Sequence, residues 1–334
     1  MMFSFTDEQD MFRDTVRDLL ANECGPEAVR ASWGNDTGRV PGLWSTLAEV
    51  GVLAIRAPEA AGGLGMDDVD LVRLLEESGY AAVPEPIVEH AAVAVPALAE
   101  GGADDLLSAA AAGEITCTVA LAAGGDLVVA ADAADLIVLE VDGVLHAVPA
   151  EAVTATPAQS IDQSRRLASI EVDLDAATAL PGADPLLAAD RATLGVAAQC
   201  VGVARRLLDS TVDYVAERHQ FGKPVGSYQA VKHHLADVRL GIEFAAPLVY
   251  RAAWSVAHPE SHDEVTRGRD VSMAKAMASD AVDTACRAAL QCHGAIGYTF
   301  EYDLQLWLKR GWALSAAWGD ARRHRDRVAD ALSL

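Results

Sequence analysis

One short stretch combines side chains that can hold an anionic, aromatic ligand. It contains Arg218, then Phe221, Gly222 and Pro224, and Gln229 follows at the start of the next predicted helix. An exposed guanidinium can bind a pyrophosphate through two parallel hydrogen bonds, and a phenylalanine ring can stack on a purine. On spacing alone, an ordinary turn between two helices explains these residues equally well.

A second stretch breaks a predicted helix with small residues. It runs from Gln291 to Tyr298 and includes Gly294, Ala295 and Gly297. Small residues let a ligand approach backbone N–H groups closely. Here too a helix–helix turn is an equally good explanation from the spacing alone.

Other candidates for chemistry carry less weight. The sequence has no GxSxG, HExxH, GxxxxGK[ST] or GxGxxG motif, which are the signatures of common hydrolases, zinc proteases and nucleotide-binding loops. His233 and His234 are adjacent in a predicted helix and point about 100° apart, so they do not bind one metal ion together. Cys292 and His293 are also neighbours, with no evident carboxylate to orient the imidazole. We expect no metal site.

Basic residues gather near the C-terminus, and two interpretations remain open for them. The favoured one is a solvated helix end whose charges suit the helix dipole. The alternative is contact with an anionic cofactor or a partner. The residues are Arg322, Arg323, His324, Arg325 and Arg327.

Composition excludes several classes of protein. The chain has 334 residues, 26 basic and 49 acidic, for a net charge of −23. Nucleic acid and anionic membranes repel such a charge. The opening residues lack the basic segment of a secretory signal, and we find no uninterrupted apolar stretch of the ~18 residues that span a bilayer. Five scattered cysteines without a CxxC pair indicate a reduced, cytoplasmic protein.

The elements that must position these side chains are mostly helices. Residues 1–113 show helical periodicity, beginning with capping-box spacing between Thr6 and Gln9 and interrupted by a Gly- and Pro-rich break at 57–67. Residues 114–180 form a small β region instead. Within it, Asp142-Gly143 separates two β-branched runs and predicts a hairpin.

Residues 185–334 return to helical periodicity and predict a bundle. One apolar seam advances in steps of three and four residues from Val231 to Val256. A second seam of small residues runs from Ala274 to Ala288 and favours close helix packing. The expected fold is therefore mostly α with a β insert: an N-terminal helical domain, a shortened middle β domain and a C-terminal four-helix bundle.

Taken together, the motifs resemble those of the acyl-CoA dehydrogenase family. Three family patterns occur in the family's order over nearly the whole chain: a PExxGGxG loop, an arginine three residues before Phe-Gly with a downstream Gln, and Gln-x-x-Gly-(Gly)-x-Gly-Tyr. They match Pro58 to Gly65, Arg218 to Gln229, and Gln291 to Tyr298, with Ala295 in place of the second glycine.

The resemblance implies a flavoprotein that removes hydrogens from Cα and Cβ of an acyl-CoA, with a carboxylate as base and FAD as hydride acceptor. In the family, residues of these motifs hold the adenine and pyrophosphate of a FAD whose ring sits in the neighbouring subunit. The corresponding residues here are Arg218, Phe221, Gln229, Gln291, Gly294 and Ala295.

Departures from the family pattern concern the flavin ring and the base. Residues 114–121 lack the polar groups that line the ring and the thioester in the family. Gly319 occupies the usual base position, and the alternative position of some relatives falls near Ala192 or Thr193, so Asp320 and Asp190 are the nearest carboxylates. Misplacing a reacting group by even ~1 Å can cost about 100-fold in rate. We therefore expect no catalytic base in this chain.

This combination is similar to the short subunits of actinobacterial heteromeric acyl-CoA dehydrogenases, some of which act on steroid side-chain CoA thioesters. It implies a heterotetramer in which a longer homologous subunit supplies the glutamate, and an electron-transfer flavoprotein that accepts the electrons. Two alternatives remain: a self-sufficient homomeric enzyme that uses Asp320 or Asp190 as base, and a non-catalytic scaffold that has lost flavin.

Overall fold

Helices dominate the first third of the chain. The computed structural model describes residues 4–333, so the first three residues of the segment searched for a secretory signal lie outside it. The predicted capping box is confirmed, since Thr6 and Gln9 each bond the other's backbone N–H. The helices are α1 (Asp7–Glu23), α2 (Pro26–Ser32), α3 (Leu43–Glu49), α4 (Asp68–Tyr80), the π-helical η2 (Val88–Ala94), α5 (Val95–Glu100) and α6 (Asp104–Ala111), with a short η1 (Glu59–Ala61) in the predicted break.

The β region follows and consists of two small sheets. Their strand orders are β1-β3-β4-β7 and β2-β6-β5. The predicted hairpin is confirmed: Val141 pairs with Val144, and Asp142 and Gly143 both have positive φ, as a tight two-residue turn requires. The strands are β1 (Cys117–Ala120), β2 (Val128–Val129), β3 (Leu136–Val141), β4 (Val144–Pro149), β5 (Val153–Ala158), β6 (Leu167–Val172) and β7 (Thr178–Leu180), with 3₁₀ turns η3 (Ala122–Gly124), η4 (Ala150–Ala152) and η5 (Leu174–Ala176).

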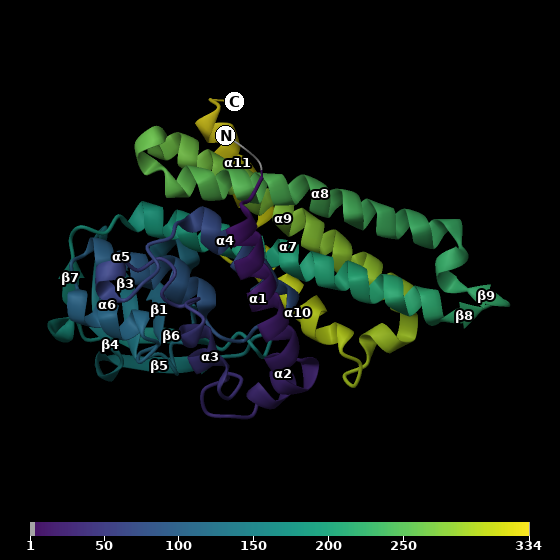
Figure 1. Ribbon diagram of the computed structural model, residues 1–334, viewed down its shortest axis with the longest axis horizontal. Helices are drawn as coiled ribbons and strands as arrows, with labels where there is room; N and C mark the ends of the chain where they lie inside the picture. Colours follow the sequence, from purple (N-terminus) through teal and green to yellow (C-terminus); the bar gives the residue numbers. More distant parts are fainter. Residues whose placement is uncertain (1–3, 334) are drawn as a thin grey trace.

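Long helices form the bundle that ends the chain. Helices α7, α8 and α9 pack along one another, and α10 packs on α7 and α9 (Figure 1). A fifth helix, α11, packs on α9. The helices are α7 (Pro185–Glu217), α8 (Gln229–Ala257), α9 (Glu264–His293), α10 (Leu304–Ala316) and α11 (Ala321–Ala331); between them lie β8 (His219–Gln220), β9 (Lys223–Pro224), η6 (Val225–Ser227), η7 (Pro259–Ser261) and η8 (Gly294–Tyr298).

Helix α7 is the central element of the core. It is long and apolar enough to cross a membrane by length and composition, but 89% of its most apolar window is buried inside the protein, as in a core helix. Glycines bring it close to α4: a Cβ on Gly202 would lie 1.9 Å from the carbonyl O of Glu76, and one on Gly79 2.2 Å from that of Gln199. The bundle and the N-terminal helices therefore share one hydrophobic core.

The predicted seam of α8 is buried except at its start. The seam residues from Val238 to Val256 face the core, whereas Val231 and Leu235 are half-exposed. Figure 1 shows why: the beginning of α8 and the hairpin β8–β9 extend past the other elements at the right-hand end.

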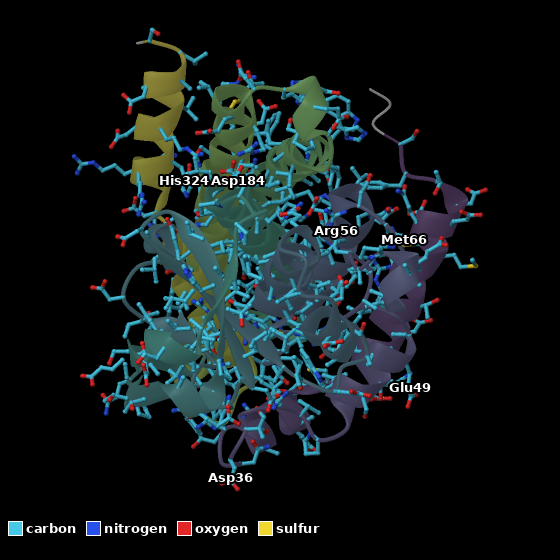
Figure 2. All side chains as sticks on the ribbon, turned by 90° about the vertical axis from the view of Figure 1, so that its left-hand side faces the viewer. Asp36, Glu49, Arg56, Met66, Asp184 and His324 are labelled. Carbon is cyan, nitrogen blue, oxygen red and sulfur yellow. The ribbon has the colours of Figure 1, made fainter. Side chains whose placement is uncertain are left out.

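Polar side chains of α9 contact the start of α7 and the start of α11. Arg267 of α9 pairs with Asp184, the N-cap of α7, at 3.7 Å, and Ser272 of α9 bonds His324 of α11 at 3.1 Å. Figure 2 accordingly shows Asp184 and His324 at the same end of the molecule.

Candidate functional site

The end of α7 carries the first predicted ligand-binding motif. Arg218 caps the helix, its backbone N–H donating to the carbonyl of Tyr214 at 2.9 Å, and the chain then forms the hairpin β8–β9. At the tip of the hairpin, Phe221 is 92% exposed and has φ +52°, followed by Gly222 with φ +80°. A bulky residue in the left-handed region is strained, and such strain concentrates at functional sites.

The end of α9 packs against the last turn of α7, just before the hairpin. Tyr214 of α7 stacks on His293 with ring centroids 4.2 Å apart, and its hydroxyl donates to the carbonyl of His293 at 3.5 Å. This contact places Gln291 and Gly294, at the end of α9, beside the end of α7. The structure thus brings the two predicted motifs together, with Gln229 one hairpin away at the start of α8.

This end of the bundle is equipped for an anionic group. Arg218 is exposed, and no ion pair within 4 Å involves it among residues 4–333. Imidazole Nε2 of His293 is buried and has no hydrogen-bond partner in the part of the chain that the structure describes. A free guanidinium, an exposed ring and an unpartnered ring nitrogen fit the adenine and pyrophosphate end of a dinucleotide.

The position predicted to lack a base is held by a network of buried polar side chains. Gly319 has φ +98°, and its carbonyl accepts a hydrogen bond from Nζ of Lys275 at 2.9 Å. Lys275 is completely buried and also donates to the carbonyl of Ser315 at 3.0 Å. Burial lowers the pKa of Lys275. His324 Nε2 donates to the carbonyl of Trp318 at 2.9 Å, so the whole turn between α10 and α11 is fixed.

The two fallback carboxylates are both engaged elsewhere. Asp320 caps α11 by accepting from the backbone N–H of Arg323 at 2.8 Å, and this hydrogen bond holds the pKa of Asp320 below its usual range. Asp190 is buried between Arg267 at 2.8 Å and Arg327 at 3.0 Å. Neither arrangement resembles a base poised to remove a carbon-bound proton.

The C-terminal basic cluster does not lie where the sequence interpretation placed it. Arg322 and Arg323 occupy the first turn of α11, so their charges oppose the helix dipole. The prediction of a favourable helix end was wrong for them, because α11 begins only after the turn at Gly319. Arg325 and Arg327 instead pair with Asp280 and Asp190.

Family models match both ends of the chain. The acyl-CoA dehydrogenase N-terminal domain matches residues 6–112 and the C-terminal domain residues 187–333. The acyl-CoA dehydrogenase IpdE2 of Mycolicibacterium smegmatis is 35% identical over 324 residues, covering 97% of this chain and 98% of its own. This chain belongs to the acyl-CoA dehydrogenase family, and it is an oxidoreductase.

Further relatives of this acyl-CoA dehydrogenase agree. IpdE2 of Mycobacterium tuberculosis is 36% identical over 91% of each chain. A variant of the Tcur3481–Tcur3483 steroid ACAD superposes with a TM-score of 0.88 at 26% identity over 98% of both chains. The ChsE4–ChsE5 complex from M. tuberculosis superposes with a TM-score of 0.89 at 24% sequence identity, covering 100% of this chain and 99% of the other. This likeness shows the shared fold.

Sequence reasoning missed several side chains of this acyl-CoA dehydrogenase. They are Glu89, Arg165 and Trp318, which line a cavity between the β region and the end of α10, and Lys275, which bonds the carbonyl of Gly319 next to Trp318. A lone Glu in the apolar run 87–99 and a Lys on the buried side of the small-residue seam were the available signals. On strand β1 the polar Thr118 faces inward, and its hydroxyl donates to the carbonyl of Val129 at 2.6 Å.

Proposed function

We propose that this chain is the base-lacking subunit of a heteromeric, FAD-dependent acyl-CoA dehydrogenase that desaturates an acyl-CoA thioester. The observation that carries the proposal is the turn at Gly319. The family's usual base position holds a glycine with φ +98°, fixed by the buried Lys275. A residue without a side chain cannot take a proton, so the glutamate base has to come from a longer homologous partner.

The contribution of this chain is the nucleotide end of an interfacial FAD site. Arg218 would bind the pyrophosphate, Phe221 would stack on the adenine, and Gln229 and Gln291 would add hydrogen bonds. Gly294 and Ala295 would leave room for close approach of the ligand. When bound, FAD supplies the hydride acceptor of the reaction. The positive side chains of this chain offset the diphosphate charge on an otherwise acidic protein.

Two neighbouring structures support an unlike partner. One is described as the ChsE4–ChsE5 complex and one as the Tcur3481–Tcur3483 steroid ACAD. By analogy we propose a heterotetramer acting on a steroid-derived thioester, with an electron-transfer flavoprotein as electron acceptor. The structure of an electron-transferring flavoprotein of Acidaminococcus fermentans superposes with a TM-score of 0.85 at 21% identity, which shows the fold alone.

The direct test compares this chain made alone with this chain made together with a longer homologue. We expect a colourless, inactive product from the chain alone and a yellow, active complex from the pair. A lone chain that desaturates a thioester with its own bound flavin would refute the proposal and favour the homomeric alternative. In that case Asp320→Asn would abolish proton abstraction while leaving flavin bound.

Arg218→Ala tests the nucleotide role directly. Losing a charge-assisted, two-bond contact costs about 1.5–3 kcal/mol, which corresponds to roughly 10–150-fold weaker FAD binding by the complex. The ratio of flavin absorbance to protein after gel filtration should fall accordingly. Arg13→Ala is the matched control, because within residues 4–333 the ion pairs of Arg13 are those with Asp10 and Asp14 of its own helix. Unchanged flavin content in the Arg218 variant would instead favour a scaffold without a flavin role.

A further inference from the structure

A pocket of about 150 Å³ lies where α1, α4, α7 and α10 meet. Helix α1 packs on α4, and the chain turns from α1 into α2 at one side of the pocket (Figure 1). Most of the lining is apolar and includes Leu20 and Ala21 of α1, Pro26 of α2 and Trp307 of α10. A cavity of about 150 Å³ can hold benzene, so a compact apolar group fits here.

Arg206 extends from α7 into this pocket and is stacked against two aromatic rings. Its guanidinium carbon lies 4.7 Å from the ring centroid of Trp307 and 5.4 Å from that of Tyr80. The indole N–H of Trp307 donates to the carbonyl of Tyr80 at 2.8 Å, which fixes the two residues relative to each other. The rings therefore hold the guanidinium plane in place before any ligand binds.

The Arg206 guanidinium has hydrogen-bonding capacity to spare. Its Nε is buried, and within residues 4–333 this atom has no hydrogen-bond partner and Arg206 forms no ion pair within 4 Å. The guanidinium does contact the hydroxyl of Tyr80, which itself donates to the exposed Asp209 at 3.1 Å. An arginine carries five N–H donors, so this one contact leaves most of them available.

The carboxylate of the lining is already engaged by other arginines. Arg17 donates to both carboxylate oxygens of Glu77, at 2.7 and 3.0 Å, and Arg205 donates to the same group at 3.2 Å. Arg205 also contacts Glu76, but burial raises the pKa of Glu76 to about 7, so much of it is neutral near that pH. Arg206 is thus the guanidinium of the described lining that no carboxylate contacts.

A free guanidinium beside an apolar surface suits a particular kind of ligand. Its planar edge binds a carboxylate through two parallel hydrogen bonds. A hydrocarbon group attached to that carboxylate gains from leaving water for the apolar wall. A phosphate dianion would bring more negative charge than one unpaired guanidinium can offset.

We propose that this pocket binds a small monocarboxylate, with the carboxylate on Arg206 and the apolar part against Leu20, Ala21 and Trp307. Such a ligand contacts α1, α7 and α10 together, so it stabilises the packing of the N-terminal helices on the bundle. The inference does not depend on which chain holds the FAD.

Benzoate, benzamide and benzamidinium are the probes, because they share one shape and carry charges of −1, 0 and +1. They are titrated into the full chain by calorimetry or ligand-observed NMR. We expect benzoate to bind about tenfold more tightly than benzamide, since a hydrogen bond between two charged groups is stronger than one to a neutral amide. Added salt should weaken benzoate binding and leave benzamide binding unchanged.

Competition shows whether the probes share the pocket. Benzamide should displace bound benzoate, whereas benzamidinium and inorganic phosphate should not. Equal affinity for benzoate and benzamide, displacement of benzoate by phosphate or benzamidinium, or no binding of benzoate would each overturn the proposal.

Arg206→Met locates the carboxylate. Methionine keeps an apolar chain against Trp307 but removes the charge, so benzoate affinity should fall about tenfold, to that of benzamide. Unchanged benzamide binding shows that the variant is folded and the pocket intact. Benzoate binding at full strength in this variant contradicts the assignment.

A pair of neighbouring variants locates the apolar part. Ala21→Glu places a carboxylate at the pocket and should weaken benzoate binding at least tenfold through repulsion. Asn22→Glu is the matched control, because it adds the same charge at an exposed position of α1 outside the lining. An equal loss of benzoate binding in both variants would show that general charge, and not this pocket, governs the affinity.

Discussion

At the scale of single residues, a buried lysine fixes the backbone of the turn at Gly319. Lys275 donates to Ser279 Oγ at 2.8 Å and to the carbonyls of Ser315 and Gly319. These bonds compensate the cost of burying an ammonium group, which without partners is prohibitive. They also fix the backbone in a conformation that suits glycine.

Gly319→Glu would place a glutamate where the family usually has its base, but we expect this glutamate not to work as a base. A side chain at φ +98° costs about 1–2 kcal/mol, and its Cβ would sit 3.0 Å from His324 Nε2. We expect lower stability in urea denaturation and no desaturation activity from the chain alone. Gly34→Glu is the control, since nothing lies within 4 Å of a Cβ there and the change should be close to neutral. A stable, active Gly319 variant would contradict this account.

Some site residues are close in sequence, and others come together only when the chain folds. Arg218, Phe221 and Gln229 lie within twelve residues of each other, so a local motif located them. Glu89 and Arg165 meet only after the N-terminal helices fold against the β region, and Lys275 meets Gly319 across two helices. No spacing rule connects positions so distant in sequence.

At the scale of elements, close approach of α4 and α7 depends on two glycines. Gly202→Ala would place a Cβ 1.9 Å from the carbonyl of Glu76, and separating the helices should cost about 1–3 kcal/mol. Thermal unfolding measures this loss. Gly241→Ala on α8 is the matched control: its Cβ would lie 3.6 Å from Ala281, and the gain in helix propensity should make it neutral or slightly stabilising. Similar stability of both variants would show that the contact can relax.

Periodicity predicted the elements well where packing is regular. The seam of α8 from Val238 onward, the hairpin at Asp142-Gly143 and the capping box at Thr6 are all local patterns that the structure confirms. Periodicity did not reveal that the first turns of α8 extend past their neighbours, because a seam does not say how long the facing helix is.

At the scale of the whole molecule, the acidic chain buries carboxyls as well as exposing them. Burial raises the pKa of Glu76 to about 7 and that of Glu85 to about 7. A carboxyl whose pKa is higher when folded than when unfolded holds its proton more tightly in the folded state. Its contribution to stability is complete below its unfolded pKa and is lost as the pH rises through the folded one.

Glu76→Gln isolates this effect. The unmodified chain should lose stability between about pH 4.5, the ordinary pKa of the carboxyl, and about pH 7, by at most roughly 1.4 kcal/mol per pH unit for one proton. The variant stays neutral, so its stability relative to the unmodified chain should rise over that range in urea denaturation. Glu85→Gln should change in the same direction. A constant difference between Glu76→Gln and the unmodified chain at every pH would contradict the assignment.

The hairpin that carries Phe221 has a consequence for the cell. The Phe221 ring is almost fully exposed, so the isolated chain presents an apolar contact at the hairpin end of the bundle. Under the proposed assembly, every copy made in excess of its unlike companion leaves that end uncovered. Balanced synthesis of the two products then protects against aggregation as well as setting the amount of working enzyme.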